Sequence, residues 1–166
     1  MAALRDVIDA MLKRRITDAV ARAAILNESS GSWTPVIRGS GTAGTYELNS
    51  TLTKCRYQKI GRRVFLDGYI TFASSITGGG TGYMQITGVP YPKVADCYCS
   101  GAVFHRGLDI VTAGAKLTVH FTTLGAGTFP LYLFESVDNG LGADFAISGV
   151  SANDDMNFSI NYETDS

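Results

Sequence analysis

The chain has 166 residues and a mass of 17.7 kDa, enough for one domain with a single hydrophobic core and a short extension. Its formal net charge of -1 offers neither the basic field that gathers nucleic acid nor the acidic field that gathers cations, so we expect no nucleic acid partner. No apolar run approaches the roughly 20 residues that cross a bilayer, and the first residues lack the apolar segment of a signal peptide, so we expect neither membrane insertion nor export.

The first predicted element is an amphipathic helix, because residues 2–26 contain no glycine or proline and apolar residues recur there at helical spacing. No second helix follows that would cover the apolar face. That face has three available surfaces: the rest of the chain, the same helix in symmetry mates, or a foreign protein. We therefore expect residues 1–28 to form an anchoring and oligomerisation segment. Its contact residues are predicted to be Leu4, Ile8, Leu12, Ile16 and Leu26.

Small polar residues at 29–32 predict a linker, and a β domain is predicted over 33–166. In that domain short apolar runs alternate with turn residues, and the 19 glycines of the chain favour short strands and many turns. The clearest strands are predicted at 63–72, 117–122 and 156–162. Weaker candidates lie at 36–39, 45–48, 53–59, 83–87, 97–104, 129–134 and 145–150. Together, about ten strands predict a mainly β fold, an antiparallel sandwich resembling a jelly roll.

Metal and cofactor sites are not indicated. The glycine-rich stretch 78–82 is interpreted as a hairpin tip, because no lysine follows it and no helix pattern begins there. Cys97 and Cys99 have the wrong spacing for common zinc sites, and His105 and His120 are the two histidines of the chain. The three cysteines cannot all pair within one chain, so we expect free thiols. The sequence predicts no metal and no cofactor.

Residues suited to catalysis are present but scattered. The nearest local set for nucleophilic chemistry is Cys99, His105 and Asp109, and no nucleophile elbow accompanies it. Cleavage of a glycosidic bond needs two converging carboxylates, and a single sequence does not show which ones converge. The available carboxylates are Glu47, Asp67, Asp109, Glu135 and Asp144. We therefore predict no enzymatic activity and name no catalytic residue.

Aromatic side chains suggest a binding role, because flat rings stack on the faces of sugars. Tyr83, Tyr91 and Tyr98 are candidate glycan contacts, and Tyr132 is a further aromatic of this kind. The alternative for each of them is packing in the core or at a subunit interface, where aromatics supply much of the buried area. Trp33 follows the predicted linker and precedes a proline, so we interpret it as a structural residue at the junction.

A series of short blocks between residues 31 and 91 carries a family resemblance. The blocks are Gly31-Ser32-Trp33-Thr34-Pro35, Gly44-Thr45-Tyr46, Tyr57-Gln58-Lys59-Ile60-Gly61-Arg62-Arg63-Val64, Gly80-Thr81-Gly82 and Ile86-Thr87-Gly88-Val89-Pro90-Tyr91. This succession resembles the β-rich domain of fibre and decoration proteins of tailed bacteriophages, in which such domains usually trimerise. It covers roughly a third of the chain.

The resemblance implies a non-enzymatic structural protein of the virion, made in the bacterial cytoplasm. We expect a homotrimeric head fibre or decoration protein whose helix docks on a capsid or tail protein and whose β domain contacts bacterial surface glycan. The short N-terminal segment favours a position on the head of the phage particle over a position on its tail. Two other hypotheses stay open: a tail fibre or receptor-binding protein, and a small protein that binds or cleaves glycans.

Overall fold

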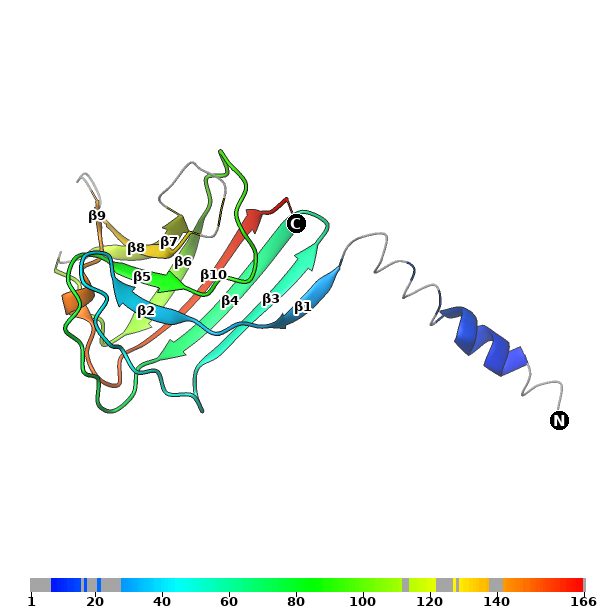
Figure 1. The fold of residues 1–166 in the computed structure, drawn as a ribbon, viewed down its shortest axis with the longest axis horizontal. Helices are drawn as coiled ribbons and strands as arrows, with labels where there is room; N and C mark the ends of the chain where they lie inside the picture. The colour runs from blue at the N-terminus through cyan, green and yellow to red at the C-terminus, as the bar shows by residue number, and fades with distance from the viewer. Residues whose placement is uncertain are drawn as a thin grey trace.

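The computed structural model describes residues 7–15, 17, 21, 28–111, 114–121, 127, 129–137 and 142–165. Residues 7–15 are helical and lie apart from the β domain (Figure 1), which confirms the predicted N-terminal helix. Ile8 and Leu12 lie in this helical segment, whereas Leu4, Ile16 and Leu26 lie outside the described residues. Among the described helical residues, no stretch is both long enough and apolar enough to span a bilayer.

The described part of the chain contains ten strands and one short 3-10 helix, so the mainly β class is confirmed. The strands are β1 (Ser29–Ser32), β2 (Val36–Gly39), β3 (Lys54–Ile60), β4 (Arg63–Thr71), β5 (Met84–Thr87), β6 (Ser100–Arg106), β7 (Lys116–Phe121), β8 (Leu131–Ser136), β9 (Ala143–Asp144) and β10 (Asp155–Glu163). The 3-10 helix η1 (Ile147–Gly149) lies between β9 and β10.

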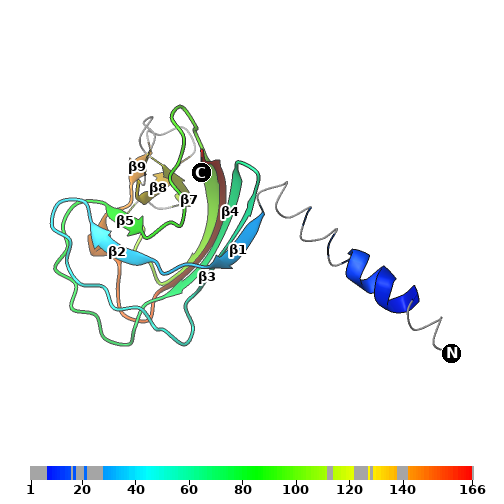
Figure 2. The ribbon, with the colours of Figure 1, turned by 45° about the vertical axis from the view of Figure 1, so that its right-hand side comes forward.

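All ten strands belong to one antiparallel sheet, in the order β1-β3-β4-β10-β6-β7-β8-β5-β2, with β9 paired to β8. The sheet curls so that its two halves face each other around a shared core (Figure 2). β1 and β2 are consecutive in the chain but lie at opposite ends of the strand order, so residues 33–35 connect the two edges of the sheet. The path is one continuous curled sheet, and a jelly-roll arrangement of two separate sheets does not follow from it.

Side chains alternate between core and outer face along β4, which lies at the centre of one half of the sheet. Val64, Leu66 and Ile70 point into the core and are fully buried, while Phe65, Asp67 and Tyr69 face outward. β4 pairs with β10 along its whole length. Gly68 also faces inward, where a Cβ atom would lie 2.5 Å from Cε1 of Phe158. The missing side chain therefore lets the Phe158 ring pack directly against the backbone.

Three local predictions differ from the structure. Residues 29–32 form β1, paired with β3, and so belong to the sheet instead of forming a linker. Their small side chains resemble a linker locally, but the backbone of β3 provides pairing partners that the sequence does not show. Residues 145–150 contain η1 in place of a strand, and 45–48 contribute only isolated bridges, Thr45 with Gly78 and Leu48 with Phe72.

Trp33 lies where the two edges of the sheet are connected. It is 7% exposed, and its ring meets that of Phe158 edge-on with the centroids 6.5 Å apart. Its backbone N–H donates to the carbonyl of Cys55 at 3.1 Å. This burial agrees with the structural role expected from the sequence.

We predict that Trp33→Ala lowers the free energy of unfolding by about 3–5 kcal/mol, because it empties a large site in the core. Trp33→Phe should cost much less, since the indole Nε1 is buried without a hydrogen-bond partner among the described residues. Urea unfolding followed by far-UV circular dichroism measures both variants. Phe104→Ala, at a side chain exposed to solvent, is the control. An unchanged midpoint for Trp33→Ala would contradict the structural role.

Candidate functional site

The outer face of β6, β7, β8, β5 and β2 carries one row of polar and aromatic side chains. The strand register aligns Ser100, His120, Tyr132, Gln85 and Arg38 across these five strands. Arg38 Nε donates to Gln85 Oε1 at 3.0 Å, and Gln85 Nε2 donates to the hydroxyl oxygen of Tyr132. The row therefore has positions fixed by backbone pairing and by its own hydrogen bonds.

His120 is held tightly within this row. Its ring contacts those of Tyr132 and Phe134, with centroid separations of 6.4 Å and 5.5 Å. Its Nε2 lies 3.3 Å from Oδ1 of Asp144, a residue of β9 that pairs with Phe134. In the tautomer that carries its hydrogen on Nε2, the imidazole donates to this carboxylate. The histidine is thus oriented by two ring contacts and, at one nitrogen, by a carboxylate.

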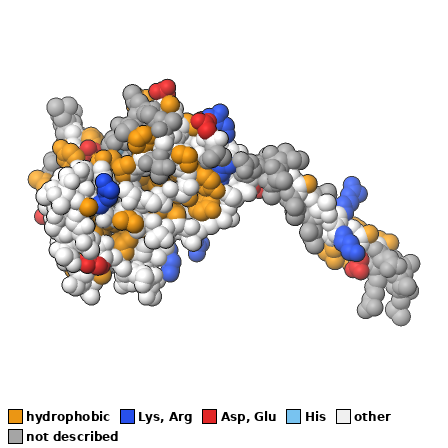
Figure 3. All heavy atoms as spheres, viewed as in Figure 1, with side chains coloured by type: hydrophobic (Ala, Val, Ile, Leu, Met, Phe, Trp, Pro, Cys, Tyr) orange, Lys and Arg blue, Asp and Glu red, His pale blue; other side chains and the backbone are white. Residues whose placement is uncertain are grey.

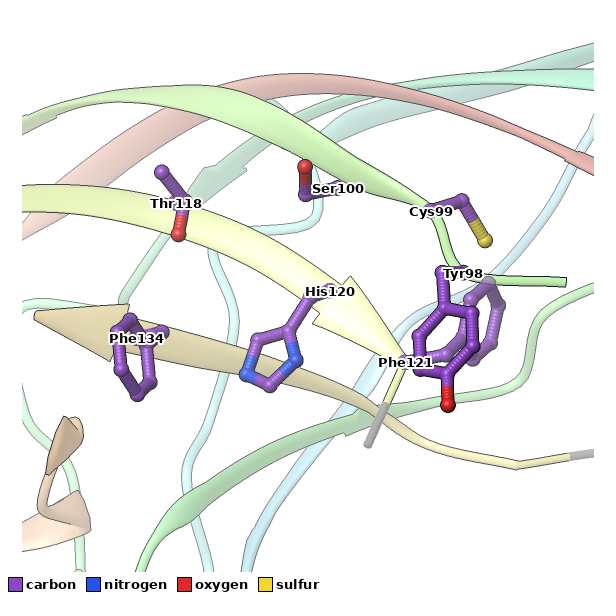
Figure 4. A pocket seen from close by; sticks show the side chains of 7 residues that line it. All are labelled: Tyr98, Cys99, Ser100, Thr118, His120, Phe121 and Phe134. Atoms are coloured by element: carbon purple, nitrogen blue, oxygen red, sulfur yellow. The ribbon is translucent and has the colours of Figure 1, made fainter. Parts of the chain in front are cut away.

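A hollow of about 360 Å³ opens beside His120. Its lining residues are Tyr98, Cys99, Ser100, Thr118, His120, Phe121 and Phe134. Phe134, His120 and Tyr98 follow one another along one flank, and Thr118 and Ser100 lie on the other (Figure 4). Tyr98 is 79% exposed, so the hollow is open to solvent at that end. We refer to these lining residues as the outer-face hollow.

Of the three tyrosines predicted to contact glycan, the structure brings only Tyr98 into the outer-face hollow. Tyr91 is half-buried, packs edge-on against Tyr57 at 5.5 Å, and shares a 2.7 Å hydrogen bond between its hydroxyl and Ser29 Oγ. Tyr83 is exposed, but it does not line the hollow and its backbone N–H is held by Ser40 Oγ. These two tyrosines are therefore not part of the same site.

The residues suited to nucleophilic catalysis are not assembled. Cys99 directly precedes β6 and His105 lies near the end of that strand, so about 20 Å of extended chain separates them. Burial, with a smaller contribution from neighbouring Cys97, raises the pKa of the Cys99 thiol to about 12. A thiol of this kind stays protonated and is a poor nucleophile at neutral pH.

The acidic residues near the C-terminus have structural partners. Asp154 Oδ2 accepts a 2.6 Å hydrogen bond from the backbone N–H of Ser151, and burial raises the pKa of this carboxyl group. Asp155 forms an ion pair with Arg106 on the neighbouring strand. No group of three histidine, cysteine, aspartate or glutamate side chains within the described ranges is arranged to hold a metal ion.

Sequence reasoning did not identify His120, Phe134 and Asp144 as members of one site. The first two were predicted to lie on strands, and Asp144 was one of five scattered carboxylates. The available signal was alternation: His120 and Phe134 each stand between buried residues of a strand, so both face outward. The pairing of β7 with β8 and of β8 with β9 then places His120, Phe134 and Asp144 together. No single segment of the sequence predicts that pairing.

Comparison with known proteins identifies a similar fold. No family model and no curated protein matches the chain. Among solved structures, the chain is similar to the Dettilon tailspike protein, with a TM-score of 0.64 and 15% sequence identity over 82% of this chain. The chain covers 24% of that tailspike. At this identity the similarity establishes a shared fold.

We predict that Cys55 and Cys99 react very slowly with iodoacetamide in the folded protein at pH 8. Burial raises the pKa of Cys55 to about 11, so roughly one thiol in a thousand is ionised three pH units lower. Alkylation should accelerate as pH rises toward these pKa values and in urea-unfolded protein, which is the control. Mass spectrometry of digested samples locates the modified cysteines. Rapid complete labelling of either thiol at pH 8 in the native state would contradict the prediction.

Proposed function

We propose that this chain is a non-enzymatic structural and attachment module of a tailed-bacteriophage particle. The observation that carries the proposal is the fold that 82% of the chain shares with a tailspike protein. The tailspike comparison supports a place on the tail, in contrast to the head fibre expected from the sequence. The helix serves as the anchor, the β domain projects outward, and three copies associate around an axis.

The exposed helical segment supports the anchoring role. Its apolar side chains Val7, Ile8, Met11 and Leu12 are between 48% and 61% exposed. In Figure 3 hydrophobic and basic side chains lie together on this segment. Full burial of one such apolar side chain is worth about 1.5–3 kcal/mol, so a partner surface that covers several of them provides a strong driving force. Matching helices of two further copies, or a tail protein, would supply that surface.

The chemistry of the outer-face hollow supports binding without cleavage. Hydrolysis of a glycosidic bond requires two carboxyl groups on opposite sides of the bond. The described residues that line the hollow include no carboxylate, and Asp144 reaches it only through His120. Glu47, another of the predicted carboxylates, is hydrogen-bonded through both oxygens to Thr77, at 2.9 Å to its backbone N–H and 2.8 Å to its hydroxyl.

We predict that the protein sediments as a trimer, at three times the 17.7 kDa of one chain, at micromolar concentration. The double substitution Ile8→Asp with Leu12→Asp should weaken assembly onto tail components, because charges then occupy an apolar contact. The control is Ala10→Asp with Lys13→Asp, which places two carboxylates off the stripe that Ile8 and Leu12 share. Sedimentation equilibrium and co-purification with particles are the measurements. A wild-type monomer would refute the trimer, and equal particle incorporation of both double variants would refute the anchor.

We further predict that the labelled protein adsorbs to bacterial cells and leaves their polysaccharide intact. The test uses pairs of isogenic strains that differ only in the presence of surface polysaccharide. Adsorption is measured by flow cytometry, and cleavage by the release of reducing ends from purified polysaccharide. Adsorption confined to the polysaccharide-bearing strains without new reducing ends is the expected result. Release of reducing ends would show an enzyme, and failure to adsorb to any strain would contradict an attachment role.

A further inference from the structure

We propose that the outer-face hollow binds a neutral pyranose unit of a surface glycan. This inference rests on the proposed function, in which the β domain faces a bacterial surface, and it adds the location and the chemical class of the ligand. The residues assigned to contact the sugar are Tyr98, Ser100, Thr118, His120 and Phe134.

The aromatic flank provides the apolar part of the site. The face of a pyranose ring that carries its C–H bonds is flat and apolar, and it packs against an aromatic ring. Tyr98 is 79% exposed and Phe134 is half-buried, so both rings have accessible surface that a sugar can contact (Figure 4). A ring as exposed as Tyr98 contributes little to the core, which makes binding a better explanation of its position than stability.

The opposite flank provides the polar part of the site. Sugar hydroxyl groups both donate and accept hydrogen bonds, and the hydroxyls of Ser100 and Thr118 do the same. They stand on the neighbouring strands β6 and β7, and Ser100 is directly paired with His120. The imidazole on the aromatic flank is already held by Tyr132, Phe134 and Asp144. Because the imidazole is held before a ligand arrives, binding loses little of its side-chain entropy.

The side chains that line the hollow favour a neutral sugar over an acidic one. The described lining residues include no lysine or arginine that would pair with a uronate carboxylate. Asp144 Oδ1 lies 3.3 Å from Nε2 of His120, and the negative charge of this carboxylate would repel a bound anion. Arg38 is in the same row, but β8 and β5 lie between its strand and His120, and its Nε is bonded to Gln85. The volume of about 360 Å³ is near the small end of ligand sites and suits a short stretch of a chain of sugars.

Titration of the full-length protein with neutral oligosaccharides tests the site. The probes are oligomers of glucose, galactose, mannose and N-acetylglucosamine, with oligogalacturonate as the acidic comparison. Binding is measured by isothermal calorimetry and by saturation-transfer NMR. We expect at least one neutral probe to bind, and oligogalacturonate to bind at least about tenfold more weakly, a difference that corresponds to one stacked or charged contact.

Variants locate the site. Tyr98→Ala should weaken binding of the neutral probe about tenfold or more, and Tyr98→Phe should retain it because the ring remains. Tyr83→Ala is the matched control, since it removes an exposed tyrosine elsewhere. Asp144→Asn should reduce the preference for neutral over acidic probes. Equal binding by Tyr98→Ala and wild type, an equal loss in Tyr83→Ala, or no saturable binding of any neutral probe overturns the proposal.

The same variants separate this site from the proposed function. Cells that adsorb Tyr98→Ala as well as wild type would overturn the site and leave the attachment role standing. A protein whose Tyr98-dependent sugar binding is present in solution but which neither assembles on particles nor adsorbs to cells would confirm the site and refute the attachment role.

Discussion

The closure of one antiparallel sheet around one core is the constraint on which the rest of the structure depends. β1 and β2 follow each other in the chain but form the two ends of the sheet, and residues 33–35 bridge them. Trp33 secures this bridge by packing against Phe158, which in turn occupies the space that Gly68 leaves free. Because the inner face is filled, every second residue of each strand is directed outward in a register that the backbone sets.

The outer-face hollow follows from that register. His120 faces outward because Val119 and Phe121 on either side of it are buried, and the pairing of β7 with β8 brings it into contact with Tyr132 and Phe134. The hollow is thus built largely on strands, whose positions are more rigid than those of loops. The backbone positions of Thr118, His120 and Phe134 are therefore set by strand pairing before any ligand binds, and the imidazole is also oriented by its own contacts, an arrangement suited to recognition. Its described lining residues include no carboxylate.

The helix and the β domain differ in how their apolar side chains are buried. The β domain buries its apolar residues within itself, as the fully buried Val64, Leu66 and Ile70 show. The described helical segment leaves Val7, Ile8, Met11 and Leu12 in contact with water. An apolar face that the described part of its own chain does not cover is stabilised by association, so the helix suits a partner while the sheet suits independent folding.

The sequence by itself determined the elements whose signal is local. The N-terminal helix follows from spacing, and β4, β7 and β10 follow from alternation of apolar and polar residues, with bounds close to those observed. The composition of residues 29–32 predicted a linker. These residues form a strand because they pair with the backbone of β3. The tertiary structure likewise decided which outward-facing residues meet. Tyr98 lines the same hollow as His120 and Phe134, while Tyr91 packs against Tyr57 and is hydrogen-bonded to Ser29. Alternation fixes the face on which a side chain lies, but its neighbours on that face come from strands far away in the chain, whose pairing is set by the closure of the whole sheet.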